Sequence, residues 1–254
     1  MWKITVYCKM SLTGKVVLIT GASKGIGKAT AQRLASEGAS LVLNYNTDAS
    51  SAEALVKEIG DDRALAVQAD ASKLPDLDRL VSSAVDKFGK IDILIPNAGI
   101  LPMRDLEHTT EADFDFTYDL MVKGPYFLAQ KAAKHIPEGG RIILVSTSVT
   151  AASTIHPSYL LYASAKAAVE QMTRVMAKDL AKVGISVNCI APGPTTTGLF
   201  LNGKSEAMVK MVAGMSPFNR IGEPDEIANA LFFLCGSDSS WVSGQILRVN
   251  GAMA

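Results

Sequence analysis

The stretch KVVLITGASKGIGKATAQRLASEG, residues 15–38, decides how the chain is expected to fold. Its first six residues form a short β-branched apolar run, which predicts a strand buried on both faces. From residue 27 the spacing is helical: Ala31, Leu34 and Ala35 fall on one stripe, and Gly38 is placed to end the helix. A glycine-rich turn between a strand and a helix directs backbone N–H groups and a helix N-terminus at an anion. The stretch therefore predicts a phosphate-binding unit, although a plain strand-to-helix turn would also contain glycine.

Strand-like and helix-like segments alternate along the rest of the chain. Further strands are expected at residues 40–45, 63–70, 91–99, 141–146, 185–193 and 245–251. Further helices are expected at residues 50–60, 73–89, 111–135, 158–182 and 224–235. This alternation predicts an α/β fold, a doubly wound parallel sheet with helices on both faces. Since no linker or composition shift interrupts it, we expect a single domain over residues 12–254, preceded by an N-terminal extension of residues 1–11.

The composition excludes several classes of function. The 25 basic and 25 acidic side chains cancel, so no basic excess points to nucleic acid or an acidic membrane surface. The cysteines Cys8, Cys189 and Cys235 lie far apart without metal-type spacing, as expected for reduced thiols in a cytoplasmic protein, and no metal site is predicted. No apolar run is long enough to span a bilayer, and the first ten residues do not make a signal peptide.

Four motifs in register resemble those of the short-chain dehydrogenase/reductase family. They are TGASKGIG (20–27), NAG (97–99), YASAK (162–166) and APG (191–193). The resemblance runs from about residue 12 to the C-terminus and implies a Rossmann-type fold. It also implies an oxidoreductase that transfers a hydride between a nicotinamide cofactor and a carbonyl or secondary alcohol.

The resemblance assigns a set of residues to the cofactor. They are Gly21, Ser23, Lys24, Gly25, Ile26, Gly27, Tyr45, Asn46, Asp70, Asn97, Gly99, Tyr162, Lys166, Pro192, Gly193, Thr195 and Thr197. Tyr45 stands where family members that prefer NAD tend to carry an acid, and no carboxylate follows until Asp48. Lys24 places a cation beside the same pocket. We therefore expect NADP(H), with NAD(H) as the less favoured cofactor.

The stretch YLLYASAK, residues 159–166, contains two candidates for a catalytic tyrosine. Positions 159, 162 and 166 share one helix face, but Tyr162 lies about 6 Å of helical rise from Lys166 and Tyr159 about 10.5 Å. Helical side chains lean toward the N-terminus, so Lys166 points back at Tyr162. A nearby ammonium lowers the pKa of a phenol from its ordinary value of about 10. We expect Tyr162 to be the acid/base and Lys166 to tune it, with Tyr159 in a pocket wall or in packing.

Ser148 follows the strand at residues 141–146, where its hydroxyl can hydrogen-bond a substrate oxygen. The resemblance makes it the third catalytic residue, although Ser146 and Thr147 compete for the role locally. His156, in the loop that follows, either lines the pocket or is solvated. Met121 stands where many relatives carry an asparagine that helps hold a proton-relay water, and a thioether cannot donate a proton.

The segment after residue 193 carries Leu199, Phe200, Leu201, Met208, Met211, Val212 and Met215. These side chains either form a lid over an apolar pocket or fill core or a subunit contact. We expect a largely apolar small-molecule ketone or alcohol as substrate, and a homo-oligomer (a tetramer or a dimer) as in the family. A carbonyl reductase is the leading expectation. A 3-oxoacyl-carrier-protein reductase shares every motif, and Met121 supports a nicotinamide-binding sensor that has lost turnover.

Overall fold

The computed structural model describes residues 11–254, which form one seven-stranded, all-parallel sheet in the order β3-β2-β1-β4-β5-β6-β7. The strands are β1 (Val16–Ile19), β2 (Ser40–Tyr45), β3 (Ala64–Gln68), β4 (Ile93–Ile95), β5 (Arg141–Val145), β6 (Ser186–Pro192) and β7 (Ile246–Val249). The predicted α/β fold, a single-domain doubly wound sheet, is confirmed. The predicted extension of residues 1–11 falls almost wholly outside the described residues and stays a prediction.

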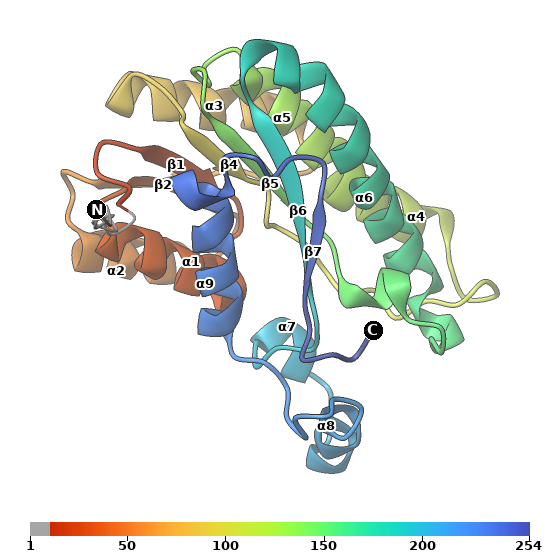
Figure 1. Cartoon of the computed structure of the whole chain (residues 1–254). Helices are drawn as coiled ribbons and strands as arrows, with labels where there is room; N and C mark the ends of the chain where they lie inside the picture. Colours follow the sequence, from red (N-terminus) through yellow and green to blue (C-terminus); the bar gives the residue numbers. More distant parts are fainter. Residues whose placement is uncertain (1–10) are drawn as a thin grey trace, which may run out of the picture.

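Helices cover both faces of the sheet (Figure 1). They are α1 (Gly25–Ser36), α2 (Ala49–Ile59), α3 (Leu74–Phe88), α4 (Glu111–Tyr118), α5 (Gly124–Ala133), α6 (Leu160–Leu180), α7 (Gly198–Leu201), α8 (Glu206–Ala213) and α9 (Pro224–Cys235). On one face α1 packs against α9, and the Arg33 guanidinium lies 4.1 Å from the centre of the Phe232 ring. The predicted α1 stripe of Ala31, Leu34 and Ala35 is buried there. On the other face α3, α5 and α6 cover a second apolar core.

The predicted helix over residues 111–135 is one helical path with an irregular middle. A π-helical turn, Asp119–Lys123, joins α4 to α5 and holds the buried Met121. Gly124 follows it, and a Cβ at that position would lie 2.2 Å from the Ala71 carbonyl oxygen. The helix therefore passes so close to the chain after β3 that only glycine fits.

The order of the strands reverses between β1 and β4, and this switch point is where open α/β sheets bind ligands. The TGASKGIG loop follows β1 and the NAG motif follows β4, so the topology brings the two motifs together. Among residues 11–254, no helix is both long and apolar enough to cross a membrane. Across the same residues, no group of three or more His, Cys, Asp or Glu side chains is arranged to hold a metal ion. Cys189 and Cys235 are buried free thiols.

Candidate active site

A cavity of about 600 Å³ lies at the carboxyl ends of the strands around the switch point. Every residue predicted to be catalytic or to bind the cofactor lines it except Gly27, which lies beneath the glycine loop. The segments that supply them follow β1, β2, β3, β4, β5 and β6, together with α6. The fold thus gathers in one place residues as far apart in the sequence as Gly21 and Thr197.

The glycine loop is held in a shape that larger residues would prevent. Gly21 and Gly25 adopt φ of +63° and +56°, in the left-handed region that favours glycine. A Cβ at Gly27 would lie 2.2 Å from the Gly21 carbonyl oxygen. Helix α1 then starts with neither a side-chain N-cap bond nor an acidic residue in its first turn. These uncapped amides and the close backbone fit a pyrophosphate, so the loop is able to hold a dinucleotide.

Two amide side chains brace this loop from below. Asn97 Nδ2 donates to the carbonyl oxygens of Thr20 and Gly21, at 2.9 and 3.1 Å. Asn44 Oδ1 accepts from the Gly21 amide at 3.2 Å, and Asn44 Nδ2 donates to Ala69 O at 2.8 Å. The sequence reasoning had included Asn97 but missed Asn44. A polar residue interrupting the apolar strand SLVLNY was the signal, because a buried amide must find partners.

At the adenosine end, Lys24, Tyr45 and Asn46 line the cavity as predicted. Asp48 also lines it, but its carboxylate caps α2 by accepting from the Ser51 amide at 3.2 Å. This hydrogen bond lowers the pKa of Asp48, to which Lys24 adds a smaller Coulomb effect. Asp70, one of the residues predicted to bind the cofactor, lines the cavity and accepts from the Ser72 amide and hydroxyl at 2.9 and 2.7 Å.

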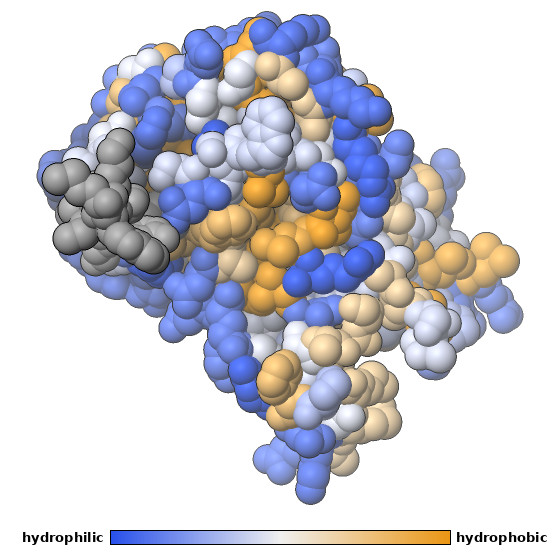
Figure 2. All heavy atoms as spheres, viewed as in Figure 1, coloured by the Kyte–Doolittle hydropathy of each residue, from blue (hydrophilic) through white to orange (hydrophobic). Residues whose placement is uncertain are grey.

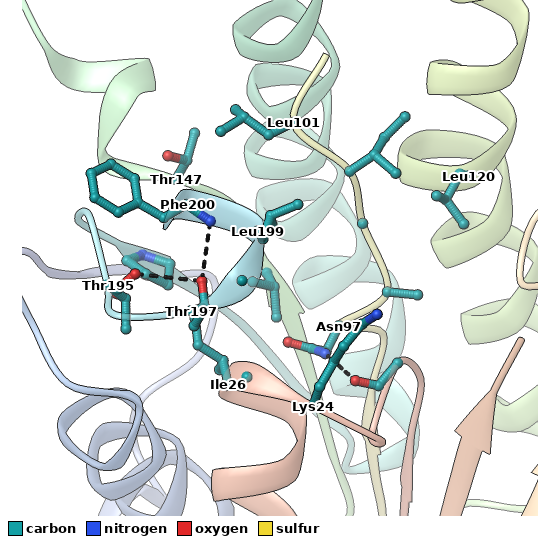
Figure 3. Close-up of a pocket in the computed structure, with 18 of the residues that line it drawn as sticks. Lys24, Ile26, Asn97, Leu101, Leu120, Thr147, Thr195, Thr197, Leu199 and Phe200 are labelled. Atoms are coloured by element: carbon teal, nitrogen blue, oxygen red, sulfur yellow. Dashed lines mark hydrogen bonds between the residues drawn. The ribbon is translucent and has the colours of Figure 1, made fainter. Parts of the chain in front are cut away.

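At the end of the cavity predicted to receive the nicotinamide, Pro192, Gly193, Thr195 and Thr197 line the wall. Figure 3 shows Thr197 close to Ile26 of the glycine loop. Thr195 is buried and donates to the Gly193 carbonyl at 2.9 Å. The Thr197 side chain accepts from the Phe200 amide at the start of α7, 3.4 Å away. Both hydroxyls therefore form hydrogen bonds within the loop itself.

Tyr162 and Lys166 lie one turn apart on α6 and are both buried, as predicted for the pair. Burial raises the pKa of Tyr162 to about 12, against the smaller lowering effect of a hydrogen bond with Thr147. The predicted net lowering of the Tyr162 pKa is wrong for this structure, because burial outweighs the lowering effects. The ammonium of Lys166 donates to the Val145 carbonyl oxygen at 2.7 Å. Tyr162 is thus a neutral phenol, the form that an acid needs in order to donate a proton.

The ammonium group of Lys166 is buried in the protein interior, where the dielectric constant is low. Burial lowers its pKa to about 8, while Coulomb coupling to the buried Cys189 acts the other way. Gly99 leaves room beside it: a Cβ there would be 3.7 Å from both Lys166 Nζ and Met121 Sδ. Met121, 1% exposed, packs in one cluster with Tyr162 and Ala165, and its thioether cannot supply a proton.

Three hydroxyls follow β5, and their bonding separates their roles. Ser146 Oγ hydrogen-bonds acceptors of the protein itself, Lys166 O at 3.2 Å and Glu170 Oε1 at 3.0 Å. Thr147 hydrogen-bonds Tyr162. Ser148 Oγ donates to the Ala191 carbonyl at 3.2 Å and borders the cavity. Thr147 and Ser148 thus both face the space where a substrate oxygen has to sit.

The remaining wall of the cavity is apolar. It is formed by Ile100, Leu101, Phe116, Leu120, Tyr159, Leu199 and Phe200. Tyr159 is a wall residue, as one of its two predicted roles required, whereas His156 is exposed and outside the lining, 2.8 Å from the Ser158 hydroxyl. Leu101 and Leu120 lie away from Lys24 in Figure 3. The sequence reasoning had not named Ile100, Leu101, Phe116 or Leu120.

The predicted lid residues divide into two groups. Leu199 and Phe200 line the cavity, but the methionines Met208, Met211 and Met215 do not. These three are 46–61% exposed, so they do not fill core either. They belong to or adjoin α8, which projects from the body of the molecule and carries apolar side chains on its surface (Figures 1 and 2).

Comparison with known proteins agrees with this geometry. A family model described as enoyl-(acyl carrier protein) reductase matches residues 21–253. The chain is 41% identical over 255 residues to a hydroxynaphthalene reductase-like protein of Metarhizium anisopliae, covering 95% of each. It is 38% identical over 258 residues to an NADPH-dependent aldehyde reductase-like chloroplastic protein of Arabidopsis thaliana, again covering 95% of each. A short-chain dehydrogenase of Burkholderia cenocepacia in complex with NADP is 33% identical, with a TM-score of 0.90 over 95% of this chain and 98% of that one.

Proposed function

This chain belongs to the short-chain dehydrogenase/reductase family of oxidoreductases, and from that premise we propose that it reduces apolar ketones with NADPH. The observation that carries the proposal is the position of Tyr162. Its buried phenol stands where the polar and apolar parts of one cavity meet, packed near Leu101, Leu120 and Tyr159. A carbonyl oxygen directed at Tyr162 leaves the rest of an apolar substrate against these side chains.

NADP(H) is the cofactor of this proposal. The uncapped N-terminus of α1 and the glycine loop receive the pyrophosphate, while Lys24 and Asn46 meet the phosphate on the adenosine ribose. Because Tyr45 stands where NAD-preferring relatives carry an acid, no carboxylate at this position repels the phosphate. When bound, NADPH supplies the hydride. Structures of relatives with NADP and NADPH, including a blue fluorescent protein from a metagenomic library at TM-score 0.91, support the choice.

Tyr162, Ser148 and Lys166 manage the proton and the charge. The Ser148 and Tyr162 hydroxyls hold the carbonyl oxygen, and Tyr162 delivers its proton as negative charge develops there. The Lys166 ammonium stabilises the phenolate that remains. A phenol whose pKa is about 12 is protonated at neutral pH, so Tyr162 is in the form that can donate a proton to a carbonyl oxygen. Proton return to Tyr162 has to avoid Met121, so it relies on water or on the backbone near Lys166.

The substrate class follows from the wall. Aromatic and branched aliphatic side chains line the part of the cavity next to Tyr162, which suits a cyclic or aromatic ketone. The hydroxynaphthalene reductase-like relative supports an aromatic substrate, and the NADPH-dependent aldehyde reductase-like relative supports carbonyl reduction with NADPH. We also expect a cytoplasmic protein and a homo-oligomer.

The test is a panel of carbonyl compounds, with NADPH consumption on each compound measured by the fall in absorbance. Bicyclic and aryl ketones are expected to be reduced with the highest kcat/KM, and small charged keto acids poorly. The panel includes a 3-oxoacyl thioester, and a clear preference for it would replace this proposal with the carrier-protein reductase. Tight NADPH binding with no NADPH consumption on any compound of the panel would instead indicate a nicotinamide-binding sensor.

A further inference from the structure

Glu170 is a buried carboxylate outside the cavity, and nothing in the proposed chemistry uses it. The residue is 7% exposed and lies on α6, one turn beyond Lys166. Burying a carboxylate is costly unless donors surround it. Its nearest cation, the half-exposed Arg174, is 3.6 Å away, which is long for a strong ion pair. The donors that matter must therefore come from elsewhere.

They come from the turn that carries Ser148. Ser146 Oγ lies 3.0 Å from Glu170 Oε1, and Thr150 Oγ1 donates to the same oxygen. Thr150 Oγ1 also lies 2.8 Å from the Thr147 carbonyl oxygen, which closes the turn. One carboxylate oxygen thus holds hydroxyls from residues two before and two after Ser148.

The position of Glu170 on α6 gives this contact its consequence. Residues 162, 166 and 170 are successive members of an i, i+4 series, so they share one helix face. Tyr162 and Lys166 point from that face to the cavity, while Glu170 points to the turn. The carboxylate is therefore a direct tie between the element carrying Ser148 and the element carrying Tyr162.

We propose that Glu170 is a positioning residue that fixes Ser148 and Tyr162 at the separation needed to hold one carbonyl oxygen. Its role in turnover rests on the proposed function, whereas the tie itself concerns the fold of the turn. A displacement of the order of 1 Å in a catalytic group lowers turnover by up to about a hundredfold. Loss of the tie should accordingly lower kcat and change the KM for NADPH little, because the residues predicted to hold the pyrophosphate and the adenosine lie on other segments.

The experiment compares four proteins: wild type, Glu170→Gln, Glu170→Leu and Thr173→Val. Glutamine keeps an oxygen acceptor for both hydroxyls and should retain kcat within about threefold, whereas leucine keeps none and should lose about tenfold or more. Thr173 is the matched control: it is buried on the same helix and donates to Val169 O at 2.9 Å without contacting the turn. A kcat loss for Glu170→Leu equalled by Thr173→Val would overturn the proposal, since any buried polar change on α6 would then do the same.

A second pair of readouts keeps the proposal testable in every case. The double variant Ser146→Ala, Thr150→Val removes the same bonds from the turn. It should reproduce the loss, and adding Glu170→Leu should cost little more. Full additivity would contradict a shared tie.

Amide hydrogen exchange over residues 146–151, which does not depend on turnover, should speed up in Glu170→Leu and not in Glu170→Gln; unchanged exchange would overturn the proposal. Wild type inactive on every ketone would refute the proposed function, and exchange would then decide the tie alone.

Discussion

At the Lys24 end of the cavity, backbone and amide groups bond one another, whereas at the Leu199 end apolar side chains stand in solvent. Asn44 is 2% exposed and makes hydrogen bonds to several backbone groups beneath the glycine loop. Leu199 is 51% exposed and Met211 60%. The predicted cofactor end is thus held by hydrogen bonds among its own groups, while the Leu199 end exposes apolar side chains. A hydrogen-bonded, rigid end favours tight, specific binding of one cofactor, and an exposed apolar end suits varied substrates.

The largest effect should come from the residue where the two ends meet. Tyr162→Phe removes the proton donor and should lower kcat by about 10²–10⁴-fold, with NADPH affinity little changed. Tyr159→Phe is the matched control, since its ring stays in the wall at a centroid distance of 6.4 Å from Tyr162. Initial rates and NADPH titration calorimetry measure the two quantities. An equal loss in both variants would contradict the choice of Tyr162.

Glycine substitutions test whether the cofactor end is the rigid one. In Gly27→Ala the new Cβ meets the Gly21 carbonyl at 2.2 Å, so the loop must shift and NADPH affinity should fall about a hundredfold. Gly214→Ala, at the end of α8, meets nothing closer than 3.4 Å. It should leave NADPH affinity within about twofold of wild type. Equal NADPH affinities of the two variants in calorimetry would mean that the cofactor end is no more rigid than α8.

The buried ammonium of Lys166 should appear in the pH dependence of stability. Its pKa of about 8 lies below the ordinary value of 10.5, so between these values the unfolded chain binds more protons than the folded one. Stability contributed by this group therefore rises with pH across that window and is lost as pH falls toward 8. Relative to Lys166→Met, wild type should gain on the order of 2 kcal/mol between about pH 8 and pH 9.5. Denaturant unfolding at both pH values measures it; parallel curves would mean that Lys166 is solvated.

The cation at the cofactor end should distinguish the two nicotinamides. Lys24→Ala should weaken NADPH binding about tenfold and leave NADH binding nearly unchanged, because only NADPH carries the extra phosphate. Lys28→Ala, an exposed lysine on α1, provides the control. Affinities for both cofactors in all three proteins give the answer. A similar loss for NADH would show that Lys24 does not select the phosphate.

The smallest effects are expected at the open end. Leu199→Ser removes apolar surface from the cavity wall and should raise the KM for an aryl ketone about fivefold. Met211→Ser changes a side chain outside that wall and should leave KM within about twofold of wild type. Steady-state kinetics with one ketone is sufficient. A larger effect from Met211 would mean that α8 covers the substrate during turnover.

The sequence predicted the strands and the cofactor motifs well, because these depend on local patterns. A β-branched run, a glycine trio and a tyrosine–lysine pair one turn apart can each be recognised within a short stretch of sequence. What escaped depends on distant partners. Asn44 acquires its role only when the turn at Gly21 lies above it, and Ile100, Leu101 and Phe116 become wall only when α7 faces them. The pKa of Tyr162 is raised and not lowered because burial dominates, and that burial arises only when distant segments pack around the phenol.

The central claim is that this cavity couples NADPH oxidation to ketone reduction through Tyr162. Single-turnover mixing of wild type carrying one equivalent of NADPH with an excess of aryl ketone tests it most directly, with the alcohol measured by mass spectrometry. We predict one alcohol per NADPH consumed in wild type, and bound but unconsumed NADPH in Tyr162→Phe on the same timescale. Persistence of NADPH in wild type, or equal turnover in Tyr162→Phe, would contradict the claim.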